Sequence, residues 1–124
     1  MSFFSTRGGA AVTASQAILY GLAPDGGLYV PETFPAFTAQ DISAMMHMTY
    51  QQRAYAVLSR FLPDFTEEEL KTAIAGAYGT GFDCEAVAPM VRVGDRAHSL
   101  ELWHGPTLAF KDMALQLLPY LLTL

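Results

Sequence analysis

Four threonines, each followed three residues later by Gln, Asp or Glu, constrain the fold of this chain more than any other feature. The pairs are Thr13–Gln16, Thr38–Asp41, Thr49–Gln52 and Thr66–Glu69. In such a capping box the threonine hydroxyl accepts from a first-turn N–H, and the third side chain reaches back to the threonine N–H. The pattern predicts helices over about residues 14–20, from Thr38, over about 50–62 and from Thr66 to about Tyr78.

Short extended segments are predicted on both sides of these helices. One lies within residues 2–12, and a second, Leu28–Val30, follows a Pro-Asp-Gly-Gly turn. Residues 91–93 and 97–102 are predicted to pair as a hairpin, because Gly94-Asp95 suits a tight two-residue turn. The fold class expected for the chain is therefore a small α+β domain, with several helices and a short β-sheet or hairpin.

Composition excludes several classes of protein. Of the 124 residues, 52% are hydrophobic and 15% charged, which is the opposite of the balance in a disordered tail. The net charge of −5 argues against a nucleic-acid partner, which is normally met by clustered Lys and Arg. The apolar run 113–124 is too short to span a membrane, and no secretory signal is visible. With Cys84 the one cysteine, we expect a soluble cytoplasmic protein.

The chemistry of the chain centres on Lys111, one of only two lysines. Gly105-Pro106 breaks the chain, and Thr107 is predicted to cap a helix that starts near Leu108, with Lys111 in its first turn. A helix N-terminus and apolar neighbours both favour the neutral amine, the form that attacks carbonyls. The carboxylate of Asp112 favours the ammonium instead. The residues alone thus leave two interpretations, a surface charge or a nucleophilic amine.

The histidines predict no second catalytic centre. His47, His98 and His104 have no metal-ligand spacing, and we expect no metal site. His104 follows the only tryptophan, at the end of the predicted hairpin, and is interpreted either as a base or as a hydrogen-bonded structural residue. No phosphate-binding loop or serine-nucleophile motif occurs.

Three stretches of this sequence together form a pattern that is typical of one enzyme family. They are Ser5–Gly8, Gly21–Pro31 and Glu101–Asp112. The third reads Glu-Leu-Trp-His-Gly-Pro-Thr-Leu-Ala-Phe-Lys-Asp and is the most specific. Together they resemble the threonine synthase family. The resemblance implies a pyridoxal-phosphate (PLP) enzyme with the α/β architecture of fold type II, the tryptophan-synthase-β type. It also implies conversion of O-phospho-L-homoserine and water to L-threonine and phosphate.

The resemblance gives Lys111 a role as the catalytic and cofactor-binding residue. By analogy with the family, its amine would hold PLP as a Schiff base and later move protons on the substrate carbons. Family members run to several hundred residues, so we expect this chain to be an N-terminal portion. Residues 1–100 would form the threonine-synthase-like N-terminal domain, and residues 101–124 would begin the PLP domain with its first helix. Alone, the chain is expected to bind PLP weakly and to be inactive.

Two alternatives remain open at this point. One is another PLP lyase of the same fold type, such as a serine or threonine dehydratase, which shares the lysine motif but lacks the Ala23–Pro31 stretch. The other is a non-catalytic docking domain. The apolar run 113–124 supports that interpretation, because an exposed apolar face is expected to self-associate or to be partly disordered. This face is expected to include Met113, Ala114, Leu117, Leu118, Leu121 and Leu122.

Overall fold

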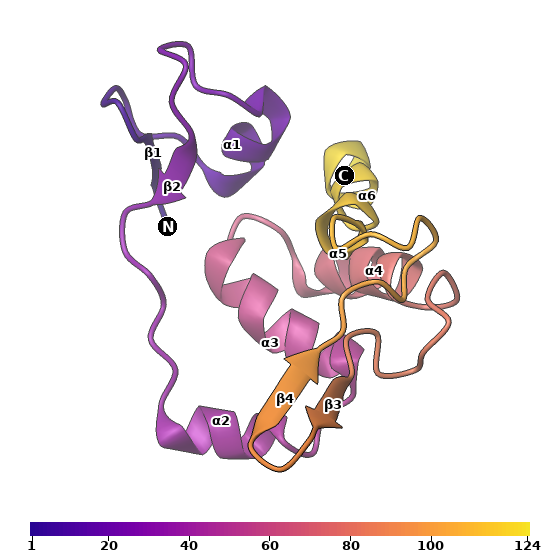
Figure 1. The fold of residues 1–124 in the computed structure, drawn as a ribbon. Helices are drawn as coiled ribbons and strands as arrows, with labels where there is room; N and C mark the ends of the chain where they lie inside the picture. The colour runs from indigo at the N-terminus through magenta and orange to yellow at the C-terminus, as the bar shows by residue number, and fades with distance from the viewer.

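Four of the six helices begin one residue after the predicted threonine caps in the computed structural model, which describes residues 1–124 (Figure 1). They are α1 (Ala14–Tyr20), α2 (Ala39–Met45), α3 (Tyr50–Phe61) and α4 (Glu67–Ala77). In every case the threonine hydroxyl accepts from the third helical N–H, and the third side chain accepts from the threonine N–H. All four predicted capping boxes are therefore confirmed.

Two small antiparallel sheets complete the predicted α+β class. Strand β1 (Phe3–Ser5) pairs with β2 (Tyr29–Pro31), so that Phe3 lies opposite Pro31. Strand β3 (Met90–Val93) pairs with β4 (Ala97–Leu100), and Gly94 supplies the positive φ of 65° in the turn between them. The strands differ from the predicted ranges by one or two residues at their ends.

Helix α4 supplies the centre of the hydrophobic core. Its residues Leu70, Ala73, Ile74 and Ala77 are all at most 3% exposed. Their i, i+3, i+4, i+7 spacing places them on one face of the helix. Helix α6 (Leu118–Thr123) packs against both α1 and α4, so the C-terminal segment shares this core (Figure 1).

The prediction of a helix from Leu108 is wrong. Helix α5 begins only at Asp112 (Asp112–Leu115), and the residues before it form a turn in which Leu108 has a φ of 57°. The physical reason is that the Thr107 side chain donates to the carboxylate of Asp112 rather than accepting from a backbone N–H. The turn therefore takes the place of the expected first helical turn.

The apolar run 113–124 is only partly exposed, which corrects the expected composition of its face. Leu117 and Leu121 are 6% and 9% exposed and belong to the core. The large apolar side chains of this run that are exposed are Leu115, Leu118, Tyr120, Leu122 and Leu124, and Ala114 is exposed as predicted. None of the helices has the length and apolar character needed to cross a bilayer.

Candidate functional site

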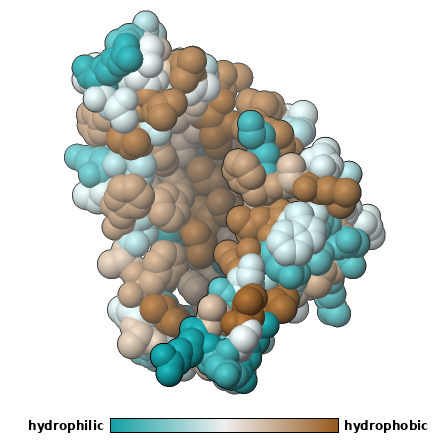
Figure 2. All heavy atoms as spheres, in the orientation of Figure 1, coloured by the Kyte–Doolittle hydropathy of each residue, from teal (hydrophilic) through white to brown (hydrophobic).

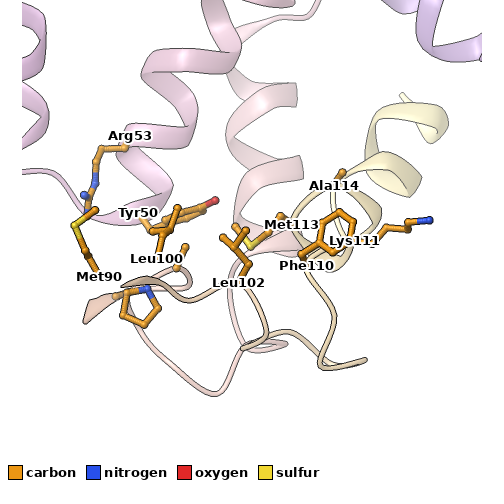
Figure 3. A pocket seen from close by; sticks show the side chains of 12 residues that line it. Tyr50, Arg53, Met90, Leu100, Leu102, Phe110, Lys111, Met113 and Ala114 are labelled. Carbon is orange, nitrogen blue, oxygen red and sulfur yellow. The ribbon is translucent and has the colours of Figure 1, made fainter. Parts of the chain in front are cut away.

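Lys111 is the residue immediately before α5, and its side chain is exposed. No hydrogen bond or ion pair engages its amine, and Figure 3 shows the amine pointing away from Tyr50. The other lysine, Lys71, is instead paired with Glu67, with Nζ and Oε1 2.5 Å apart. The chain therefore carries one lysine amine that is free to react.

The carboxylate of Asp112 organises the turn that precedes this amine. Asp112 is 1% exposed, and its carboxylate accepts from the backbone N–H of Thr107 at 2.8 Å and from the Thr107 hydroxyl at 2.9 Å. Burial raises the pKa of this carboxyl, but the hydrogen bonds from Thr107 outweigh that effect and hold the pKa below its ordinary value. The carboxylate thus faces inward, and it does not pair with Lys111 as the sequence suggested.

Gly105 fits against this carboxylate because it has no side chain. A Cβ at this position would lie 2.5 Å from the Cβ of Asp112. The Gly105 carbonyl accepts from the N–H of Leu108 at 3.0 Å, which closes the turn. A positive φ is uncommon for leucine, so the bonds to Asp112 hold the turn in a conformation that local preference does not favour.

An apolar groove of about 740 Å³ lies beside the Lys111 turn (Figure 3). Its volume is within the range of small-molecule sites. Most of its lining is hydrophobic and comes from α3, the β3–β4 hairpin with the loop before it, and the segment from Leu102 to the start of α5. Its residues are Tyr50, Arg53, Ala86, Ala88, Pro89, Met90, Leu100, Leu102, Phe110, Lys111, Met113 and Ala114. Lys111 therefore stands at the margin of a concave apolar surface.

The hydroxyl of Tyr78 ties α5 to the core. Tyr78 follows α4 and donates to the carbonyl of Met113 at 2.6 Å. Burial raises the pKa of Tyr78 to about 12, because the charged phenolate is costly away from water. The ring of Tyr50 packs edge-on against that of Tyr78, with centroids 5.1 Å apart. The position of Lys111 thus depends on contacts with α3 and α4.

His104 lies between two carboxylates that the sequence did not assign to the site. Its Nδ1 is 2.5 Å from Oδ1 of Asp83, and its Nε2 is 2.8 Å from Oε2 of Glu101. Glu101 lies only three residues earlier, whereas Asp83 is brought in by the loop after α4. No cluster of His, Cys, Asp or Glu side chains is arranged to hold a metal ion.

The first two motif stretches contact each other at the N-terminal end of the molecule. The Ser5 hydroxyl donates to the Asp25 carboxylate at 2.6 Å, and the Gly27 N–H donates to the same oxygen at 2.9 Å. Arg7 donates to the Asp25 carbonyl at 3.1 Å. The sequence assigned no pairing to Arg7, and here it helps to join β1 to the turn before β2.

Comparison with known proteins agrees with the resemblance seen in the sequence. Residues 2–78 match the family described as threonine synthase N terminus. A threonine synthase of Pseudomonas aeruginosa is 44% identical over 98% of this chain, and one of Methylobacillus glycogenes is 42% identical over 95%. The chain spans only 26% and 27% of those two proteins.

Solved structures give the same assignment. A threonine synthase from Brucella melitensis, described as PLP-bound, superposes with a TM-score of 0.92 over 98% of this chain at 43% identity. The Escherichia coli threonine synthase superposes with a TM-score of 0.87 over 99% of the chain at 30% identity. The chain spans 26% and 28% of those two structures. This chain therefore belongs to the threonine synthase family and corresponds to its N-terminal region.

Proposed function

We propose that this chain forms the N-terminal part of a PLP-dependent threonine synthase acting on O-phospho-L-homoserine, in the cytoplasm. The observation that carries the proposal is the free amine of Lys111, presented by a turn that the buried Asp112 holds. The match of the whole chain to threonine synthases, at a TM-score of up to 0.92, supports it. Residues 1–100 and 101–124 are proposed as the N-terminal domain and the start of the PLP domain.

Within this proposal Lys111 is the residue that holds the cofactor. An exposed primary amine without an ion-pair partner fits covalent attachment to an aldehyde. When bound, PLP supplies an electron sink for the substrate carbons. Lys111 then holds and transfers a proton at its Nζ, while Asp112 and Thr107 keep the turn in place. The groove beside it presents Leu102, Phe110 and other apolar groups to one side of the lysine.

A chemical trapping experiment tests the role of Lys111. The chain is incubated with PLP and reduced with borohydride, and the modified lysine is identified by mass spectrometry. We expect the adduct on Lys111, because the ion pair with Glu67 raises the pKa of Lys71 and makes that amine a poorer nucleophile. Lys71 is thus an internal control. An adduct distributed equally over both lysines would contradict the assignment.

Activity is tested in a chimera that carries this chain in place of the matching quarter of the Pseudomonas aeruginosa enzyme. We expect phosphate release from O-phosphohomoserine, and none from the Lys111→Arg form. Formation of a keto acid from threonine, without phosphate release, would favour the dehydratase alternative.

A second proposal concerns the exposed apolar side chains of the C-terminal run. One face of the molecule is hollowed and lined largely by hydrophobic residues (Figure 2). Leu115, Leu122 and Leu124 are each at least 47% exposed. We propose that the chain alone self-associates through this segment. Sedimentation velocity should show a dimer or larger species that Leu122→Glu reduces, and a monodisperse wild-type monomer would refute the proposal.

A further inference from the structure

Both ring nitrogens of His104 face carboxylate oxygens. Asp83 lies at Nδ1 and Glu101 at Nε2, at 2.5 and 2.8 Å. The two partners differ in exposure, since the side chain of Glu101 is 19% exposed and that of Asp83 is 68% exposed. The His104 side chain itself is 16% exposed, so water has limited access to the ring. The indole of Trp103 stacks on the ring at a centroid distance of 5.5 Å.

With both carboxylates ionised, this geometry fits an imidazole that carries two protons. An ionised carboxylate only accepts hydrogen bonds, and a neutral imidazole has a single N–H to donate. A neutral ring would therefore place a nitrogen lone pair against a carboxylate oxygen. The hydrogen bond with Glu101, followed by that with Asp83, raises the pKa of His104 above its ordinary value. No other charged group contributes to that shift.

The imidazole connects two segments that are far apart in the sequence. Asp83 belongs to the loop after α4, which Phe82 and Val87 anchor in the hydrophobic core at 9% and 1% exposure. The backbone N–H of Asp83 also donates to the carbonyl of His104 at 3.0 Å. Since Gly105 and the Lys111 turn follow directly, this contact fixes where that turn begins.

We propose that His104, as an imidazolium held between Asp83 and Glu101, is a positioning residue for Lys111. The cation replaces the repulsion between two neighbouring carboxylates with two charge-assisted hydrogen bonds. It thereby holds the segment that carries the Lys111 amine against the Asp83 loop, which Phe82 and Val87 anchor in the core. The effect of His104 on the attachment of PLP rests on the proposed function of Lys111. The attachment of the Lys111 segment to the Asp83 loop does not depend on that function.

The protonation state is tested first in the unaltered chain. With 15N-labelled histidine, the nitrogen shifts of His104 should show that the ring loses its second proton at a pH above 6.5, the ordinary pKa of histidine. Because the folded pKa is raised, the stabilisation is complete below about pH 6.5 and is lost as the pH rises through the raised value. A ring that loses its second proton at or below pH 6.5 would overturn the proposal without any variant.

Amide hydrogen exchange at Thr107, whose N–H donates to Asp112, tests how firmly His104 holds the Lys111 segment in place. We expect His104→Gln and Glu101→Gln to speed this exchange by about tenfold or more, as for the loss of a charge-assisted hydrogen bond. Asp83→Asn should have a smaller effect, because the carboxylate of Asp83 is more exposed. The control is His98→Gln, since His98 is exposed on β4. Unchanged exchange in both His104→Gln and Glu101→Gln would overturn the proposal.

A third measurement separates this inference from the proposed function. At low pH the yield of the borohydride-trapped PLP adduct on Lys111 should be lower in His104→Gln than in the wild type. Because the amine itself becomes more reactive as it loses its proton, the two chains are compared at the same pH, and their difference should shrink as the pH rises through the titration of His104. Equal yields in the two chains at low pH overturn the positioning role. An absence of any Lys111 adduct in the wild type, with the imidazolium and slow Thr107 exchange intact, counts against the proposed function alone.

Discussion

The hydroxyl of Tyr78 provides a direct measure of how firmly the Lys111 segment is held to the core. Its bond to the carbonyl of Met113 is the only hydrogen bond which that carbonyl receives, because α5 ends too soon to supply a helical partner. Tyr78→Phe removes the donor and leaves the carbonyl unpaired. A net hydrogen bond contributes about 1 kcal/mol and an unsatisfied group costs somewhat more, so we expect a loss of about 1.5 kcal/mol.

Urea unfolding followed by circular dichroism measures this loss. In thermal unfolding the same change lowers Tm by roughly 5 °C for a chain of this length. The matched control is Tyr50→Phe, since Tyr50 packs on the same ring but its hydroxyl has no hydrogen-bond partner. We expect the control to lie within about 0.5 kcal/mol of the wild type. Equal stability of the two variants would refute the argument that the Tyr78 hydroxyl anchors α5.

Three further predictions concern the core and the turn. Since the pKa of Tyr78 rises from 10.0 to about 12 on folding, stability is fully present below pH 10 and falls as the pH approaches 12. Between pH 10 and pH 12 the urea midpoint should decline less in Tyr78→Phe than in the wild type. Equal declines in the two chains would argue against a raised pKa of Tyr78. Leu70→Ala should cost about 2–5 kcal/mol in urea unfolding, because Leu70 is 1% exposed. Leu19→Ala, at a 68% exposed site, should cost little, and similar losses would contradict the core assignment. Gly105→Ala should speed amide exchange in the turn, because its methyl group meets the buried aspartate, whereas Gly81→Ala, in open space, should not.

The motif around Lys111 is the basis for proposing this lysine as the site residue, but the sequence did not predict the structure that surrounds it. The helix predicted from Leu108 was wrong, because Thr107 has two alternatives, to cap a helix or to bond a carboxylate. Asp112 lies five residues further along, and its burial beneath Gly105 decides between them. No local pattern in the sequence reveals that burial.

The pairing of His104 shows the same limit. Glu101 lies only three residues before His104, but the pattern of the predicted strand did not indicate that the side chains of Glu101 and His104 contact each other. Asp83 is 21 residues away and arrives only because Phe82 and Val87 anchor its loop in the core. The exposure of the C-terminal run was predicted only in part, since α1 and α4 cover Leu117 and Leu121.

The sequence by itself determined four of the six helix starts, the hairpin, the α+β class and the family, because each depends on residues close together in the chain. Capping boxes act over three residues, and a motif of a dozen residues carries most of the resemblance to the family. The tertiary structure alone decided which way Asp112 faces, what His104 contacts and which leucines are buried. Those outcomes depend on burial and on long-range hydrogen bonds, whose strength is set by neighbours that the chain brings together only on folding.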